Sequence, residues 1–126
     1  MSEGTPVILC IDDDPDVLES LRLVLEHRNC VVRTANSGQA GLQAYQAEKP
    51  DLVIVDLMME EADSGLAFVQ NIRALGATPP VYMLSSVGDA LTQNIDFSQL
   101  DLTGVLQKPV VPDMLLKIVD HVLKKG

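Results

Sequence analysis

Short apolar runs recur along the chain, separated by segments with helical periodicity. The first run, Val7–Ile11, is continuously apolar and contains β-branched side chains, which is typical of a strand covered on both faces in a parallel sheet. Comparable runs predict further strands along the rest of the chain. These strands are Cys30–Ala35, Leu52–Val55, Val81–Leu84 and Gly104–Gln107.

The segments between the runs predict amphipathic helices. Asp14 followed by Pro15 is an N-cap and first-turn signature, and apolar positions such as Leu21 and Leu25 extend this helix to about Arg28. Residues 87–103 have weak periodicity, although Asp89 is suited to cap a helix there. The remaining predicted helices are one capped by Ser37 and ended by Pro50, one carrying Leu66, Val69 and Ile72, and one beginning at Asp113.

Five alternations of strand and helix favour an α/β fold. We expect a flavodoxin-like three-layer sandwich, in which a five-stranded parallel sheet of order 2-1-3-4-5 lies between five helices. A chain of 126 residues suits one compact domain and is too short for two ordinary ones. The prediction is therefore a single domain over residues 1–126, with a core of about residues 6–124.

Composition narrows the function. The chain carries 9 basic and 18 acidic residues, a net charge of -9, which disfavours direct nucleic-acid binding. The apolar runs are far shorter than the ~20 residues of a membrane span, and no secretion signal opens the chain, so we expect a cytoplasmic location without membrane contact. Cys10 and Cys30 lie in apolar runs and are interpreted as reduced core residues.

Polar side chains follow four of the predicted strands. Asp12 and Asp13 follow the first strand, Asp56 the third, Ser85 the fourth and Lys108 the fifth. Each alone is an ordinary capping, turn or surface residue. Ligands of open parallel sheets bind beyond the carboxyl ends of the strands, so together these residues predict one shared crevice.

The chemistry of this set is complementary. Three clustered carboxylates repel one another unless cations compensate, and Mg²⁺ with one lysine supplies that compensation. A carboxylate can attack phosphorus and form an aspartyl phosphate, while cations stabilise the transferring group. Asp56 is the predicted phosphoacceptor, Lys108 the partner of the phosphoryl oxygens, and the Ser85 hydroxyl a hydrogen-bond donor to them.

The whole chain resembles the receiver domain of bacterial two-component response regulators. Ile11–Pro15 is similar to the family's acidic motif after the first strand, and Leu52–Asp56 to its phosphoacceptor strand. Met83–Ser86 is similar to its hydroxyl switch, and Lys108-Pro109 to its lysine and following proline. The resemblance implies a switch that is phosphorylated by a sensor histidine kinase or a histidine phosphotransfer protein. It also implies that the domain catalyses only its own phosphorylation and dephosphorylation and is not otherwise an enzyme.

The resemblance also implies residue roles. Asp13 and Asp56 would bind Mg²⁺ directly together with the backbone carbonyl of Met58, and Asp12 largely through water. The Lys108-Pro109 peptide would be cis. Ser85 and the strand-five position, here Val105, would form the switch. An effector domain or a second copy of the chain would dock on the face formed by the fourth helix, the fifth strand and the fifth helix.

Several positions depart from the family pattern. Glu60 replaces the usual proline, Gly65 lies one residue farther from Asp56 than is typical, and Val105 replaces an aromatic residue. Leu100–Thr103 replaces the small residues that usually precede the fifth strand. The phosphorylation site is therefore expected to be complete and the output face divergent.

Two rival functions would need other residues at these positions. A flavodoxin needs a phosphate loop where this chain has three acids, and a haloacid dehalogenase phosphatase needs a second aspartate at Met58. The remaining alternative is a pseudo-receiver, an interaction module that keeps the fold without phosphorylation. His27 and His121 have no second ligand at metal spacing, and Met58 and Met59 are interpreted as packing residues.

Overall fold

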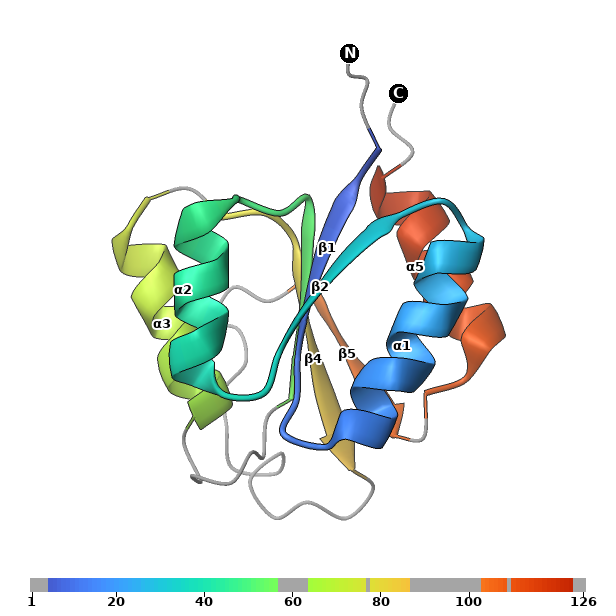
Figure 1. The fold of residues 1–126 in the computed structure, drawn as a ribbon, viewed down its shortest axis with the longest axis horizontal. Coiled ribbons are helices and arrows are strands. Elements are labelled where there is room, and N and C mark those ends of the chain that lie inside the picture. Colours follow the sequence, from blue (N-terminus) through green and yellow to red (C-terminus); the bar gives the residue numbers. More distant parts are fainter. Residues whose placement is uncertain (1–4, 57–63, 77, 87–102, 109, 124–126) are drawn as a thin grey trace.

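The computed structural model describes residues 5–56, 64–76, 78–86, 103–108 and 110–123. Its centre is a five-stranded sheet in the order β2-β1-β3-β4-β5, and all of its strand pairs are parallel (Figure 1). The predicted strand order is confirmed. The strands are β1 (Val7–Ile11), β2 (Val31–Ala35), β3 (Leu52–Asp56), β4 (Val81–Ser86) and β5 (Gly104–Lys108).

Helices cover both faces of the sheet. Figure 1 shows α2 and α3 together on one face and α1 and α5 together on the other. The predicted helix at Asp89 falls within residues 87–102 and lies outside the described residues. The helices of the described part are α1 (Pro15–His27), α2 (Gly38–Ala47), α3 (Ser64–Ala74) and α5 (Pro112–Leu123).

Local signals account for the helix ends. Asp14 caps α1, because its side chain accepts a hydrogen bond from the Asp16 backbone N–H, and Pro15 occupies the first turn. Ser37 caps α2 in the same way. Asn29, just past α1, has a positive φ of 65°, a conformation that asparagine tolerates and that turns the chain towards β2. The caps predicted at Asp14 and Ser37 are confirmed.

The core is divided by the sheet into two apolar clusters. One lies under α2 and α3, and there Tyr45 and Phe68 meet edge to face with ring centroids 6.3 Å apart. The other lies under α1 and α5 and includes Leu21 and Leu115. All five residues of β3 are buried, which explains why this strand reads as a continuous apolar run.

Both cysteines are free and buried, as predicted. Burial raises the pKa of the Cys10 thiol to about 12, with smaller contributions from Asp12 and Cys30. Burial also raises the pKa of Cys30, against the opposing effect of Arg28. Both thiols are therefore protonated at neutral pH and poorly nucleophilic.

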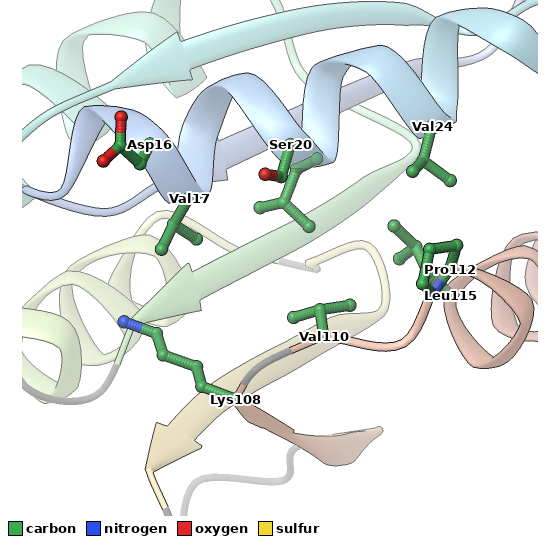
Figure 2. A pocket seen from close by; sticks show the side chains of 9 residues that line it. Asp16, Val17, Ser20, Val24, Lys108, Val110, Pro112 and Leu115 are labelled. Atoms are coloured by element: carbon green, nitrogen blue, oxygen red, sulfur yellow. The ribbon is translucent and has the colours of Figure 1, made fainter.

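A cavity of about 280 Å³ lies between α1 and the chain that leads into α5 (Figure 2). The side chains that line the cavity are mostly apolar and include Val17, Val24, Val110, Pro112, Leu115 and the stem of Lys108.

At the other end of these two helices, Arg28 and Asp120 form an ion pair that joins α1 to α5. No helix in the described part of the chain has the length and apolarity needed to cross a bilayer.

Candidate functional site

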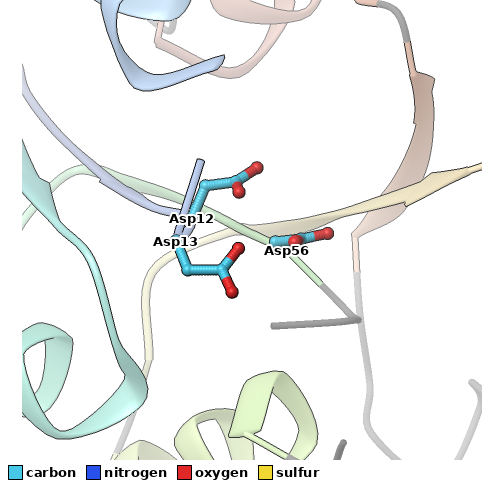
Figure 3. A group of neighbouring side chains, drawn as sticks. All are labelled: Asp12, Asp13 and Asp56. Atoms are coloured by element: carbon cyan, nitrogen blue, oxygen red, sulfur yellow. The ribbon is translucent and has the colours of Figure 1, made fainter. Parts of the chain in front are cut away.

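Three aspartates gather at the carboxyl end of the sheet. Asp12 directly follows β1, and Asp56 is the last residue of β3. These strands are neighbours with Ile11 opposite Val55, so Asp12 and Asp56 end adjacent strands at the same level. Asp13 continues the chain beside them, and ligand oxygens of the three side chains all lie within 4.8 Å of one another (Figure 3).

The three carboxylates differ in their access to water. Asp12 is 0% exposed and Asp56 is 3% exposed, whereas Asp13 is exposed. A buried carboxylate is unfavourable unless a cation or hydrogen bonds compensate its charge. The site therefore has a closed side at Asp12 and Asp56 and an open side at Asp13.

Lys108 supplies the compensating charge. Its Nζ lies 3.0 Å from Asp12 Oδ2 and 3.3 Å from Asp56 Oδ2. The residue ends β5, and Figure 2 shows its side chain extended towards the end of β3. One ammonium group therefore contacts both buried carboxylates.

The pKa of Lys108 reflects two opposing effects. Partial burial of the ammonium is the largest single effect and lowers the pKa, but the hydrogen bonds and charges of Asp12 and Asp56 together outweigh it. The pKa of Lys108 is consequently raised above its ordinary value. The side chain therefore stays charged at neutral pH.

The two oxygens of Asp12 have different surroundings. Asp12 Oδ1 accepts a hydrogen bond of 2.9 Å from the backbone N–H of Asp14. Asp12 Oδ2 is buried and accepts no well-aligned hydrogen bond within the described residues, and its close contact with Lys108 is an ion pair. The Asp14-Pro15 pattern predicts only a helix cap at Asp14 and not its contact with Asp12, although aspartate commonly accepts a hydrogen bond from the N–H two residues on.

The donor set fits a hard divalent cation. Three carboxylates opposed by one ammonium leave two uncompensated negative charges, and all the ligand atoms are oxygens. Mg²⁺ prefers one or two carboxylates and retains several waters. The exposed Asp13, next to Asp12 and Asp56 in the same acidic group, suits that requirement because water reaches it.

Ser85 lies on β4, next to β3 in the sheet, and Val105 lies on β5, next to β4. Ser85 is buried within β4, one residue beyond Leu84, the partner of Asp56. β4 continues to Ser86, two residues past its predicted end, because this segment still pairs with β5. Val105 lies opposite Met83 on β5 and is 42% exposed.

The remaining predicted features are only partly described. Gly65 belongs to the first turn of α3. Met58 and Glu60 fall within residues 57–63, outside the described residues, and so do Pro109 and therefore the expected cis peptide. Their roles stay predictions.

Comparisons with known proteins agree with this geometry. The model of the family described as response regulator receiver domain matches residues 8–120. The chain is 35% identical over 126 residues to the transcriptional regulatory protein GlrR of Escherichia coli, covering 100% of this chain and 28% of that protein. It is 30% identical over 118 residues to the response regulator MprA of Mycobacterium leprae, covering 94% of this chain and 51% of that protein. The chain thus spans about half or less of the length of these relatives.

Solved structures show the same fold. A putative response regulator from Chloroflexus aurantiacus has a TM-score of 0.84 at 31% identity, covering 97% of this chain and 100% of that chain. The chemotaxis protein CheY4 of Vibrio cholerae has a TM-score of 0.84 at 26% identity, covering 94% of this chain and 99% of that chain. The resemblance expected from the motifs is confirmed, and the protein belongs to the response regulator receiver domain family of two-component signalling systems.

Proposed function

We propose that this chain is the phosphoacceptor switch of a two-component phosphorelay, in which Asp56 receives a phosphoryl group in a Mg²⁺-dependent reaction. The observation that carries the proposal is the placement of Lys108 Nζ within 3.3 Å of the Asp56 carboxylate and 3.0 Å of the Asp12 carboxylate. The proposed nucleophile, a cation and a group of carboxylate oxygens that could hold a metal ion lie together at the carboxyl edge of the sheet.

The donor is a sensor histidine kinase or a histidine phosphotransfer protein. A carboxylate oxygen of Asp56 attacks phosphorus in the phosphohistidine, the phosphorus–nitrogen bond breaks, and the imidazole leaves with the bonding electron pair. Lys108 then pairs with the phosphoryl oxygens, and the hydroxyl of Ser85 donates a hydrogen bond to them. The domain catalyses only its own phosphorylation and dephosphorylation.

Asp13 and Asp56 would hold the metal together with the backbone carbonyl of Met58, and Asp12 would act largely through water. When bound, Mg²⁺ neutralises charge on the transferring phosphoryl group. The chain's own part is to keep two carboxylates buried beside one ammonium, so that the arriving group meets oriented charges in a partly dry site.

The partner is proposed to dock on the face that includes β5 and α5. Three large apolar side chains are exposed there: Val105 on β5, Val111 just before α5, and Met114 on α5. Exposed apolar patches mark protein contacts, and the acidic charge of the chain disfavours direct nucleic-acid binding. We therefore propose an effector domain or a second copy as the partner, with residues 1–126 as a single cytoplasmic receiver domain.

The residue at the strand-five switch position favours a second candidate function, that of a pseudo-receiver. The exposed Val105 cannot act as the aromatic switch that the family usually carries on strand five. A pseudo-receiver would keep the fold and use it as an interaction module without phosphorylation.

Intact mass after incubation with Mg²⁺ and acetyl phosphate separates the two candidates. The receiver gains the mass of one phosphoryl group, which hydroxylamine removes because it is an acyl phosphate, and the Asp56→Asn variant gains none. A native protein whose mass does not change under these conditions identifies the pseudo-receiver. Modification that persists in Asp56→Asn places the acceptor on another residue.

A further inference from the structure

The turn between β1 and α1 contains two successive contacts of the same kind. The backbone N–H of Asp14 donates to Asp12 Oδ1 at 2.9 Å, and the backbone N–H of Asp16 donates to Asp14 Oδ1 at 2.9 Å. In each contact a carboxylate accepts from the N–H two residues later. Asp14 belongs to both contacts, with its backbone in the first and its side chain in the second.

The backbone of Asp14 is held from both sides. It is extended, with φ −95° and ψ 110°, which is the region to which a following proline confines a residue. Its carboxylate accepts a hydrogen bond from the first turn of α1, and its backbone carbonyl accepts hydrogen bonds from the N–H groups of Val17 and Leu18. The direction of the Asp14 N–H is consequently tied to the position of α1.

Asp12 receives its orientation from this N–H. With Oδ1 held by Asp14, the carboxylate presents Oδ2 to Lys108 at 3.0 Å. That oxygen is fully buried and accepts no well-aligned hydrogen bond in the described part of the chain. Because Asp12 is both a member of the acidic group and the partner of Lys108, a change in the direction of the Asp14 N–H would also change this site.

We propose that Asp14 is a positioning residue for the metal site: its carboxylate fixes the turn at the start of α1, and its N–H thereby sets the orientation of Asp12. This inference rests on the proposed Mg²⁺-dependent phosphorylation of Asp56. It extends the part played by Asp14 beyond stabilising a helix. A residue that acts only as a cap changes the free energy of unfolding and leaves the metal affinity of the folded protein unchanged.

The test compares dissociation constants for Mg²⁺, measured by isothermal titration calorimetry on the whole metal-free chain. Asp14→Asn keeps a capping oxygen and removes one charge, and Asp16→Asn removes the same charge from the next turn without a contact to Asp12. These two variants should bind Mg²⁺ equally well. Asp14→Ala lacks the side-chain oxygen that fixes the turn and should bind Mg²⁺ several-fold more weakly than Asp14→Asn, whatever the loss of the cap costs the free energy of unfolding.

Asp14→Gly guards against a variant that fails to fold, since glycine at an N-cap costs a helix only a few tenths of a kcal/mol. It also lacks the side chain that fixes the turn, so its Mg²⁺ affinity should fall like that of Asp14→Ala. Equal Mg²⁺ affinity in Asp14→Gly, Asp14→Asn and Asp16→Asn would overturn the inference.

The failure of the inference is distinguishable from the failure of the proposed function. A native protein that binds Mg²⁺ and gains one phosphoryl group, with affinity unaffected by Asp14→Gly, leaves the proposed function standing and removes the inference. A native protein that binds no Mg²⁺ and gains no phosphoryl group overturns both.

Discussion

The ammonium of Lys108 lies 3.0 Å from Asp12 Oδ2, although two strands separate β5 from β1 in the sheet. The long side chain of lysine spans this separation at the carboxyl edge. Its stem lines the cavity between α1 and α5, while its charged end reaches the acidic site. A single residue thus connects the packing of two helices with the charge balance of three carboxylates.

Removing this charge should destabilise the metal-free protein. Lys108→Met leaves two buried carboxylates without their cation, which should lower the free energy of unfolding by roughly 3 kcal/mol, the lower end for a buried ion pair because the Lys108 side chain is 21% exposed. Urea unfolding in the presence of a chelator measures it. Lys117→Met, at an exposed position of α5, is the matched control and should change stability by less than about 0.5 kcal/mol. Similar losses in both variants would show that the ion pairs of Lys108 are not needed for stability.

Mg²⁺ should stabilise the folded state by linkage. A ligand present at a hundred times its dissociation constant adds about 2.7 kcal/mol to the free energy of unfolding. Millimolar Mg²⁺ should therefore raise the Tm of the native protein and do little for Asp13→Ala. Asp51→Ala removes a carboxylate from the opposite end of the sheet and should retain the response. An equal rise for Asp13→Ala would refute the metal site.

Stability should fall at alkaline pH because of Cys10. The folded pKa is about 12, and unfolding returns the thiol to its ordinary value of 9.0, so above that value the unfolded chain releases the proton first. The stability due to the buried neutral thiol is complete below pH 9 and is lost as the pH rises towards 12, by up to about 1.4 kcal/mol per pH unit.

Urea unfolding of the native protein and Cys10→Ala between pH 8 and pH 10.5 isolates this effect from the titration of other groups. The native protein should lose stability more steeply above pH 9, whatever the difference between the two proteins at pH 8. Parallel pH profiles would contradict the predicted protonation of Cys10.

Phosphorylation should be transmitted mainly around β4. A phosphoryl group shifts a conformational equilibrium only through contacts that differ between the two states, and Val105 is short and restricted about χ1. Hydrogen exchange with and without beryllofluoride, an aspartyl-phosphate mimic, should therefore change most in peptides covering residues 57–65 and 85–95. Changes centred on β5 and α5, with little near Ser85, would show that the missing aromatic side chain has no such consequence.

Much of the fold follows from sequence alone because strand burial and helix caps leave local signals. The apolar run of β3 and the Asp14-Pro15 pair were sufficient to place two elements. The shared edge of parallel strands was enough to bring Asp12, Asp56 and Lys108 together.

Other features depend on distances that no local pattern encodes. The sequence did not distinguish the buried Asp12 from the exposed Asp13, since both are acids in the same turn. It also did not show that Lys108 contacts Asp12 as well as Asp56, because this depends on the reach of one side chain across the strand ends. The cavity beneath α1 arises from the spacing of two helices and has no sequence signature.

The complete burial of β3 has a consequence for how a signal is generated. Its central position gives it hydrogen-bonded neighbours on both sides, β1 and β4, so opening it would break the hydrogen bonds along both of its edges. Asp56 therefore ends a strand that is held on both edges, whereas β5 pairs with β4 alone in the described sheet. If Asp56 is phosphorylated as proposed, the new group is attached to a strand held on both edges, and a change of shape is expected in the segments around β3 rather than in β3 itself.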